Sequence, residues 1–241
     1  MENRFDFFAG EVICINKPLR VTSFQVVSKV KWAINHHLKQ YPDNISDKNA
    51  RLRVGHAGTL DPLASGVLLV CTGKKTKTIS QLQNLEKEYT GTFFLGATTP
   101  CFDLEREIDF TYPTDHIREE DILATAKQFT GKQNQKPPAF SAVKINGERA
   151  YELARKGIPV ETTEKEIEIK TFEITRIQIP LVSFRVVCSK GTYIRSLARD
   201  VGTALNSGAH LTELCRTRIG EYSVQDSHNL HDFMENLVKQ P

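Results

Sequence analysis

Short apolar runs along the chain predict strands. Their side chains are mainly β-branched or aromatic, which suits a pleated sheet that is at least half buried. In the longest run the apolar residues alternate with polar ones, which indicates a strand with one solvent-facing side. The segments with this character are residues 11–16, 67–71, 89–95, 165–179 and 181–188.

Helical spacing of apolar residues appears between these runs. The first helix follows Pro18 and can be capped by Thr22 or Ser23. Its expected apolar face consists of Phe24, Val27, Val30, Ile34 and Leu38. Further helices are expected at residues 119–129, 148–156 and 192–205. In the last of these, Ile194, Leu197, Val201 and Leu205 form the buried stripe, and Arg195 lies on another face. The polar, proline-containing segment 41–53 predicts a loop.

Strands and helices that follow each other without regular alternation favour an α+β fold. We expect a largely antiparallel mixed sheet flanked by helices. No repeat or glycine- and proline-rich linker divides the chain, so we expect a single domain over residues 1–241, with a core from about residue 11 to 222. The N-terminus has no basic and apolar leader, and the apolar run 67–71 is too short to cross a bilayer. We therefore expect a cytoplasmic protein.

Charge is distributed unevenly, although the net charge is only +3. Basic runs occupy residues 17–32, 74–77 and 185–218, and the last holds six basic residues against two acidic ones. One such run alone is typical of a solvated surface, but three together favour a face that binds a polyanion. The five cysteines lie at least 27 residues apart, and no second ligand stands near His56. We expect no metal site.

Residues 55–66 form the segment best suited to chemistry. They are rich in turn-forming residues and lead directly into the apolar strand at 67–71, which predicts a rigid loop on a core strand. Asp61 is the only acidic side chain in the loop. An Asp-Pro pair in a glycine-rich loop is, however, more often a turn than a catalytic site, so the spacing leaves both interpretations open.

A second candidate segment is residues 190–195, at the start of the last predicted helix. Backbone N–H groups, the Tyr193 phenol and the Arg195 guanidinium meet there, which suits contact with an anion or a carboxylate. The alternatives are a core-edge aromatic for Tyr193, a surface ion pair for Arg195 and an ordinary strand aromatic for Tyr89. The residues alone therefore indicate an RNA-compatible enzyme or binding protein.

Residues 55–66 (GHAGTLDPLASG) closely resemble the signature loop of the TruB family of tRNA pseudouridine synthases, which modify uridine 55 in the T loop. Other matching motifs follow in family order between about residues 11 and 222. They are residues 16–18 with 22–23, 87–89, 136–144, 188–195 and 208–211.

The resemblance implies a reaction in which uridine is flipped out of the RNA and isomerised without a cofactor. Asp61 matches the essential aspartate, which acts at the sugar C1′ or on the base. Arg195 matches the arginine that pairs with it, and a neighbouring cation keeps a buried carboxylate ionised. Tyr89 matches the tyrosine that stacks on the flipped base. These three are the expected catalytic residues.

The resemblance also implies a set of substrate-binding residues. His56 matches the histidine that fills the space left by the flipped nucleotide. Tyr193 and Leu214 match residues that line the uracil pocket. Lys17 with Pro18 matches the motif that buttresses the catalytic loop, so its expected role is structural rather than catalytic.

The chain departs from the family pattern at Arg20, where a glycine is usual, and we expect no C-terminal PUA domain. The expected partner is tRNA, through its T arm, with no membrane and no obligate protein partner. Three alternatives remain open. The substrate could be ribosomal or guide-directed RNA, or the protein could be a non-catalytic RNA-folding factor. It could also be a carboxylate-based glycosidase, which would need a second acid near Asp61.

Overall fold

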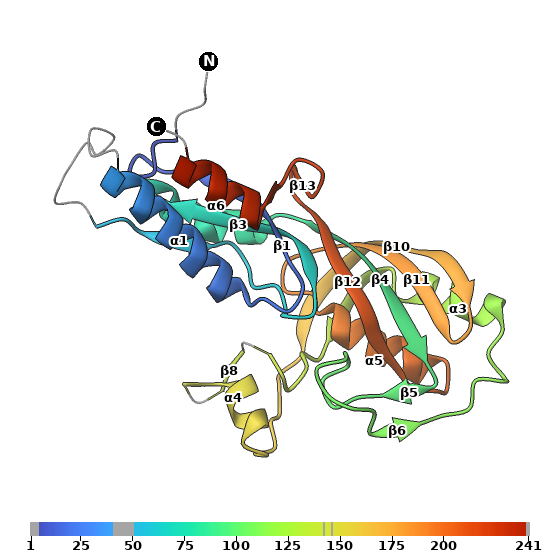
Figure 1. The fold of residues 1–241 in the computed structure, drawn as a ribbon. Helices are drawn as coiled ribbons and strands as arrows, with labels where there is room; N and C mark the ends of the chain where they lie inside the picture. The colour runs from blue at the N-terminus through green and yellow to red at the C-terminus, as the bar shows by residue number, and fades with distance from the viewer. Residues whose placement is uncertain (1–4, 41–50, 142, 146, 240–241) are drawn as a thin grey trace. The chain divides into compact units, whose positions relative to one another are not determined.

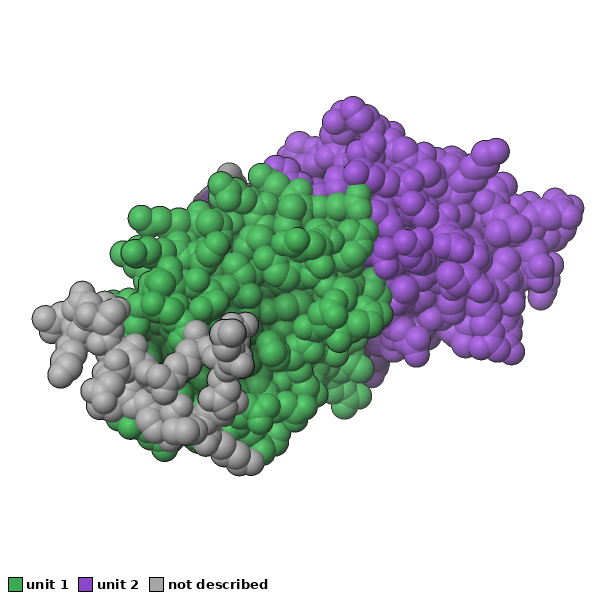
Figure 2. Space-filling model, turned by 90° about the horizontal axis from the view of Figure 1, so that it is seen from above, with its two compact units in different colours: residues 1–87, 215–241 green, residues 88–214 purple. Residues whose placement is uncertain are grey.

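The computed structural model (Figure 1) describes residues 5–40, 51–141, 143–145 and 147–239. The chain clusters into two compact units (Figure 2). Unit 1 comprises residues 1–87 and 215–241, and unit 2 comprises residues 88–214. Strand β12 (Ala209–Ile219) contains the return from unit 2 to unit 1, so its two ends belong to different units.

Unit 1 is built on a mixed sheet with helices. Within it the strands follow the order β14-β1-β3-β12, with β2 paired to β3 and β13 paired to β12. The pairs β1–β3 and β2–β3 are antiparallel, whereas β1–β14 and β3–β12 are parallel. Besides its part of β12, unit 1 consists of β1 (Val12–Lys17), α1 (Ser23–Gln40), β2 (Val54–His56), β3 (Ser65–Thr72), the 3-10 helix η2 (Gly73–Thr78), α2 (Ile79–Asn84), β13 (Tyr222–Ser223), β14 (His228–Asn229) and α6 (Leu230–Lys239).

Strand β3 is buried on both of its faces. Leu68 and Val70 join the cluster formed by β1, α1 and α6. Val67 and Leu69 point to the other side, into a second cluster that includes Ile219 and residues of α2. This double burial explains why residues 67–71 are continuously apolar, because neither face of the strand meets water.

Helix α1 confirms most of its predicted pattern and corrects one position. Thr22 is the capping residue, because its Oγ1 accepts from the Gln25 backbone N–H at 3.1 Å while the Gln25 side chain accepts from the Thr22 N–H at 2.8 Å. The buried face holds Val26, Val30 and Ile34. The prediction that Phe24 is buried was wrong, since its side chain is 75% exposed. It lies two positions before Val26, about 200° away around the helix.

Unit 2 contains a second set of strands, in the order β12-β4-β11-β10-β7, and two small hairpins, β5–β6 and β8–β9. Strand β10 is antiparallel to both β11 and β7. The elements of unit 2 are β4 (Lys87–Leu95), whose first residue belongs to unit 1, β5 (Ala97–Thr98), β6 (Phe110–Thr111), α3 (Glu119–Gln128), β7 (Gly131–Gln135), β8 (Lys144–Ile145), β9 (Glu148–Arg149), α4 (Ala150–Arg155), β10 (Lys165–Gln178), β11 (Leu181–Cys188) and α5 (Ile194–Ala204).

An aromatic cluster forms the centre of the unit 2 core. Phe93 of β4 stacks on Phe184 of β11, with ring centroids 4.1 Å apart, and Phe172 of β10 meets both rings edge-on. Offset stacking and edge-on contacts are the favourable arrangements for aromatic rings. The predicted stripe of α5, from Ile194 to Leu205, is buried as expected. The core of unit 2 therefore joins side chains from three strands, β4, β10 and β11.

The predicted α+β class with a largely antiparallel mixed sheet is confirmed. The single domain over residues 1–241 stays a prediction, because the division into units does not show whether either unit folds alone. The predicted loop at 41–53 lies mainly outside the described residues, which resume at residue 51. Within the described part of the chain, no helix has the length and apolar character needed to span a membrane.

Candidate active site

The loop of residues 57–64 joins β2 to β3 and carries Asp61. The two strands pair antiparallel, with His56 opposite Val70. Asp61 begins a tight turn, because its carbonyl oxygen accepts a hydrogen bond from Ala64 N at 3.1 Å. Proline is favoured at the second position of such a turn. The Asp-Pro pair is thus a turn, and the turn presents a half-buried carboxylate.

Arg216 of β12 holds the part of the loop that precedes Asp61. Its guanidinium donates from Nη2 to the Gly58 carbonyl at 3.2 Å and from Nη1 to the Thr59 carbonyl at 3.3 Å. Its Nε donates to the Val67 carbonyl of β3 at 2.8 Å. The side chain is only 2% exposed. A buried, charged donor with a planar fork of N–H groups strongly restrains the backbone that it contacts.

Two side chains from the N-terminal part of unit 1 hold the rest of the loop. Ser23 of α1 accepts from Leu60 N at 2.8 Å and donates to the Leu60 carbonyl at 3.0 Å. Lys17 Nζ donates to the Pro62 carbonyl at 3.4 Å, and Arg20 N donates to the same oxygen at 2.7 Å. With the bonds from Arg216 and the bond that closes the turn, every backbone carbonyl from residue 58 to residue 62 accepts a hydrogen bond.

Gly66 permits the close approach of β12 to the loop. Arg216 pairs with Gly66 in the parallel β3–β12 ladder. Gly66 has a φ of 102°, and a Cβ atom there would lie 2.2 Å from the Arg216 carbonyl oxygen. Only glycine fits a position that combines this conformation with this contact. The glycine at the end of the loop motif is therefore required by the strand that supplies Arg216.

Lys17 is a buried cation beneath the loop. Its side chain is fully buried, and its Nζ also donates to the carbonyls of Pro18 at 2.9 Å and Val21 at 2.7 Å. Burial lowers its pKa from 10.5 to about 8, while the negative charge of Asp61 opposes this fall and the charge of Arg216 adds to it. Lys17 contacts backbone in the described structure, which agrees with a buttressing role.

His56 ends β2 at the entrance to the loop. Burial lowers the pKa of its imidazole, the Gly58 backbone partly offsets this, and the charge of Arg216 lowers it further. The ring is therefore neutral at pH 7. Its buried Nδ1 makes no hydrogen bond within the residues that the structure describes. A buried nitrogen without a hydrogen bond is able to bind a polar group of a ligand.

Arg195 lies in the first turn of α5, in unit 2. Its Nε is 3.7 Å from an Asp103 carboxylate oxygen, and its Nη atoms donate to the carbonyls of Cys101 at 3.3 Å and Phe140 at 2.9 Å. Both charged side chains are buried, so the surface ion pair considered for Arg195 is replaced by a buried one. The predicted pairing of Arg195 with Asp61 joins residues of different units and stays a prediction.

The other expected site residues of unit 2 lie on two strands and just before a helix. Tyr89 lies on β4 and is buried, with 8% exposure. Tyr193 immediately precedes α5, where its backbone exchanges hydrogen bonds of 2.8 and 3.1 Å with the Gln135 side chain of β7. Leu214 is half-buried on β12. Their roles in binding uracil stay predictions.

The geometry therefore brings Asp61, Lys17 and His56 together within unit 1. The sequence did not indicate three of these contacts. They are the hydrogen bonds of Arg216 to the loop, those of Ser23 to Leu60 and the ion pair of Asp103 with Arg195. Arg216 stood only within a basic run, and nothing local distinguishes it from Arg218 two positions later, which is only half-buried. A carboxylate on a turn whose backbone is held at every carbonyl is well suited to act in one fixed direction.

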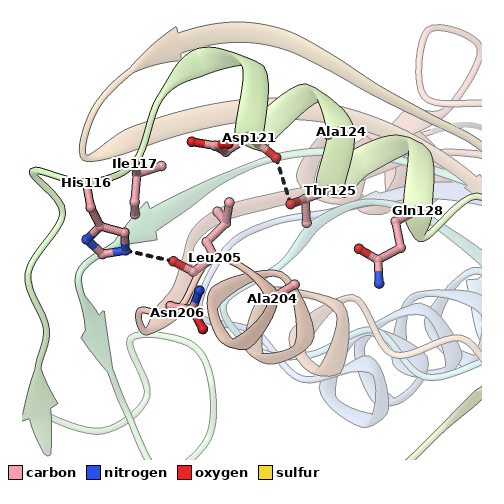
Figure 3. A pocket seen from close by; sticks show the side chains of 9 residues that line it. All are labelled: His116, Ile117, Asp121, Ala124, Thr125, Gln128, Ala204, Leu205 and Asn206. Atoms are coloured by element: carbon pink, nitrogen blue, oxygen red, sulfur yellow. Dashed lines mark hydrogen bonds between the residues drawn. The ribbon is translucent and has the colours of Figure 1, made fainter.

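Two further features do not belong to this arrangement. No cluster of three or more histidine, cysteine or acidic side chains suited to a metal ion occurs among the described residues. A cavity of about 320 Å³ lies in unit 2 beside α3 and α5 (Figure 3). Two polar side chains that line the cavity already donate hydrogen bonds to backbone carbonyls. His116 donates to the Leu205 carbonyl at 3.0 Å, and Thr125 donates to the Asp121 carbonyl at 2.7 Å. None of the expected site residues lines it.

The chain matches two family models that together cover most of its length. Residues 46–194 match "TruB family pseudouridylate synthase (N terminal domain)". Residues 195–240 match "tRNA pseudouridylate synthase B C-terminal domain". The boundary between the two models falls within α5, next to Arg195.

Two similar proteins share the name tRNA pseudouridine synthase B. "tRNA pseudouridine synthase B" of Flavobacterium johnsoniae is 53% identical over 96% of this chain and 98% of its own length. The protein of the same name from Bacteroides fragilis is 51% identical over 98% of this chain and 97% of its own length.

Solved structures with the same fold include a chain of the "Crystal Structure of a Cbf5-Nop10-Gar1 Complex". It has a TM-score of 0.68 and is 30% identical to this chain over 95% of the chain. The match covers 54% of that longer protein. A chain from an "H/ACA RNP bound to a substrate RNA containing 2'-deoxyuridine" has a TM-score of 0.66 and 28% identity, with the same coverage of both chains.

Proposed function

This chain belongs to the TruB family of pseudouridylate synthases and is an isomerase, and we propose that it converts uridine 55 in the T loop of tRNA to pseudouridine. The observation that carries the proposal is the nearly full-length similarity to relatives named tRNA pseudouridine synthase B. The held loop around Asp61 supports it, because a rigid carboxylate is what the reaction needs. As an enzyme of tRNA, the protein is proposed to act in the cytoplasm.

The reaction rearranges bonds within one nucleotide. The bond between uracil N1 and sugar C1′ breaks, and a bond between uracil C5 and C1′ forms after the base has turned. The proton on C5 leaves, and N1 takes up a proton, so no atom is gained or lost overall. Asp61 is the proposed catalytic carboxylate, acting at C1′ or on the base. Arg195 is proposed to keep it ionised, and Tyr89 to stack on the flipped uracil.

The substrate-binding residues have distinct proposed tasks. His56, neutral and with an unsatisfied buried nitrogen, is proposed to occupy the space that the flipped nucleotide leaves. Tyr193 and Leu214 are proposed to line the uracil pocket. Lys17 is proposed to act from below the loop, through the Pro62 carbonyl, rather than on the RNA.

The test is conversion of an unmodified T-arm stem-loop and of full-length tRNA by the purified protein, in buffer containing EDTA. We expect pseudouridine at the T-loop uridine and nowhere else in the RNA. Asp61→Asn should give no product while binding the same RNA within about threefold of the wild-type affinity. Product formed by Asp61→Asn would remove Asp61 from its role. Dependence on an added metal or partner protein would contradict the prediction that neither is needed.

Guide-directed RNA is the second candidate substrate. The similarity to a chain of an H/ACA RNP bound to a substrate RNA favours it, although that similarity is lower than the similarity to the tRNA-named relatives. The two candidates separate in one assay. Conversion of the T-arm stem-loop by the protein alone supports tRNA, and conversion only of a substrate paired to a guide RNA would support the alternative.

A further inference from the structure

Helix α1 of unit 1 has one face that no described element of that unit covers. Its inner face packs against β1, β3 and α6 (Figure 1). Its outer face contains two large apolar side chains, Phe24 and Trp32, which are 75% and 57% exposed. We call the side chains of Phe24, Lys29, Trp32, His36 and Lys39 the α1 outer face. Their positions fall within one side of the helix at 3.6 residues per turn.

The aromatic residues on this face are arranged for contact with flat ligands. Trp32 stacks on His36 one turn away, with ring centroids 5.3 Å apart and planes 17° from parallel. Phe24 and Trp32 are eight residues apart, which places them about 12 Å apart along the helix on the same side. Large exposed aromatic residues gathered on one face are uncommon on a soluble protein and mark binding surfaces.

The charge of this region selects the kind of partner. From residue 12 to residue 40 the chain has no acidic residue, and it has five lysine or arginine residues. Lys29 and Lys39 lie exposed on the α1 outer face itself. Aromatic rings that stack on bases, flanked by cations that contact phosphates, are the common means of binding unpaired nucleic acid.

The start of α1 is attached directly to the catalytic loop. Ser23, the residue before Phe24, exchanges two hydrogen bonds with Leu60, which is adjacent to Asp61. An RNA that places one nucleotide at Asp61 therefore has the start of α1 within a short distance. The outer face then offers a path about two helical turns long for the neighbouring nucleotides.

Arg20 adds a cation at the same end. Its φ of 62° is a left-handed conformation that glycine adopts without strain, and glycine is usual at this position in the family that the chain resembles. Arg20 keeps this conformation through the bond from its N–H to the Pro62 carbonyl, and its side chain is exposed. A strained residue with an exposed charge beside a catalytic loop suggests a functional contact.

We propose that the α1 outer face, with Arg20, is an RNA-docking surface on which Phe24 and Trp32 stack unpaired bases and the basic side chains hold phosphates. The inference rests on the proposed function, since it takes the substrate RNA as the ligand. It goes beyond that function by assigning a second contact region outside the uracil pocket.

Trp32 is the only tryptophan in the chain and reports directly on this surface. The probe is full-length unmodified tRNA, titrated into Asp61→Asn protein so that no turnover occurs. We expect RNA to quench the Trp32 emission and to protect it from acrylamide, because a base stacked on the indole does both. Unchanged emission and unchanged acrylamide access at saturating tRNA would overturn the proposal.

Substitutions give an independent measurement. Trp32→Ala and Phe24→Ala should each raise the dissociation constant for tRNA about 10-fold, the usual effect of losing one stacked base. Lys29→Ala should reduce the dependence of the affinity on salt by about one phosphate contact. The matched control is Leu123→Ala, which removes a side chain that is 53% exposed on α3 and should leave the affinity unchanged. Equal affinities for all variants would overturn the proposal.

Arg20→Gly separates binding from folding. Relief of the left-handed conformation should leave the melting temperature the same or higher, while tRNA binding should weaken several-fold. Unchanged binding would remove Arg20 from the surface.

Failure of this inference is distinguishable from failure of the proposed function. Normal conversion of tRNA with no response at Trp32 would overturn the docking surface alone. No conversion of any RNA would overturn the function instead. Protection of Trp32 that grows with protein concentration in the absence of RNA would assign the surface to a second copy of the chain and overturn the RNA assignment.

Discussion

Arg216 Nη1 donates to the Thr59 carbonyl oxygen at 3.3 Å, two residues before Asp61, although 157 positions separate the two residues in the chain. The same guanidinium also holds the Gly58 and Val67 carbonyls. The position of the loop that carries Asp61, the proposed catalytic carboxylate, therefore depends on a buried cation from strand β12.

Arg216→Lys should lower the rate of pseudouridine formation by about 10- to 100-fold. Lysine keeps the charge but cannot donate simultaneously in the directions of a guanidinium, and small displacements of a catalytic group have effects of that order. Single-turnover kinetics at saturating tRNA measure it. The control is Arg218→Lys on the same strand, where a half-exposed pair with Glu86 can be kept by lysine. Equal rates for both variants would contradict the role of Arg216.

The pH dependence of stability should reveal Lys17. Its folded pKa of about 8 lies below the ordinary value of 10.5, so between these values the unfolded chain binds more protons than the folded chain. The free energy of unfolding due to this group therefore rises with pH from about 8 to 10.5 and is constant below that window. Activity should move the other way, because the neutral amine has fewer N–H donors for the loop.

Denaturant unfolding and turnover, each measured from pH 7 to 10 in wild type and Lys17→Met, test this prediction. The variant lacks the titrating amine, so its stability should rise less steeply across the window. Parallel stability curves for the two proteins would show that Lys17 does not titrate there.

Ser23→Ala should lower the free energy of unfolding by about 2 kcal/mol, because it leaves both backbone groups of Leu60 without their partner. It should also slow turnover, since Leu60 precedes Asp61. Ser28→Ala, exposed on the same helix, is the matched control and should change stability by less than about 0.5 kcal/mol. A stable but inactive Ser23→Ala protein would place the effect in the loop alone and contradict the predicted loss of stability.

Asp103→Ala should lower the free energy of unfolding by about 3 kcal/mol, because it removes the carboxylate from a buried pair with Arg195. Chemical denaturation measures the loss. Glu120→Ala provides the comparison, since the pair of Glu120 with Arg118 is exposed at 4.0 Å and should contribute less than about 1 kcal/mol. Similar losses for the two variants would mean that the Arg195–Asp103 contact contributes little.

Some structural elements could be predicted from short-range patterns in the sequence. The continuous apolar run at 67–71 predicted a core strand, and it forms β3, which is buried on both faces. The stripe of α5 was also predicted correctly. Phe24 was placed wrongly because spacing alone does not fix the centre of an apolar face. The buried face is centred on Val26, Val30 and Ile34, and Phe24 lies outside it.

Strand β12 could not be predicted, because charged residues interrupt its apolar positions. It is a strand because it pairs with β3, β4 and β13, and its partners in β3 are residues 65–66, far away in the chain. The motif that contains Asp61 could be recognised from the sequence, since its glycines and proline are needed locally for the turn. Arg216 and Asp103 could not, because what makes a charged side chain buried and paired is the backbone or carboxylate that folding brings to it.

The sequence by itself therefore determined the family, the class of the fold and which loop is proposed to be catalytic. These depend on residues that are close together along the chain or match a continuous motif. Only the tertiary structure decided what holds the loop, which cations lie beneath it and which face of α1 stays exposed. Those properties arise from contacts between distant segments, and the hydrogen-bond partners of a polar or charged side chain have no signature in a local pattern.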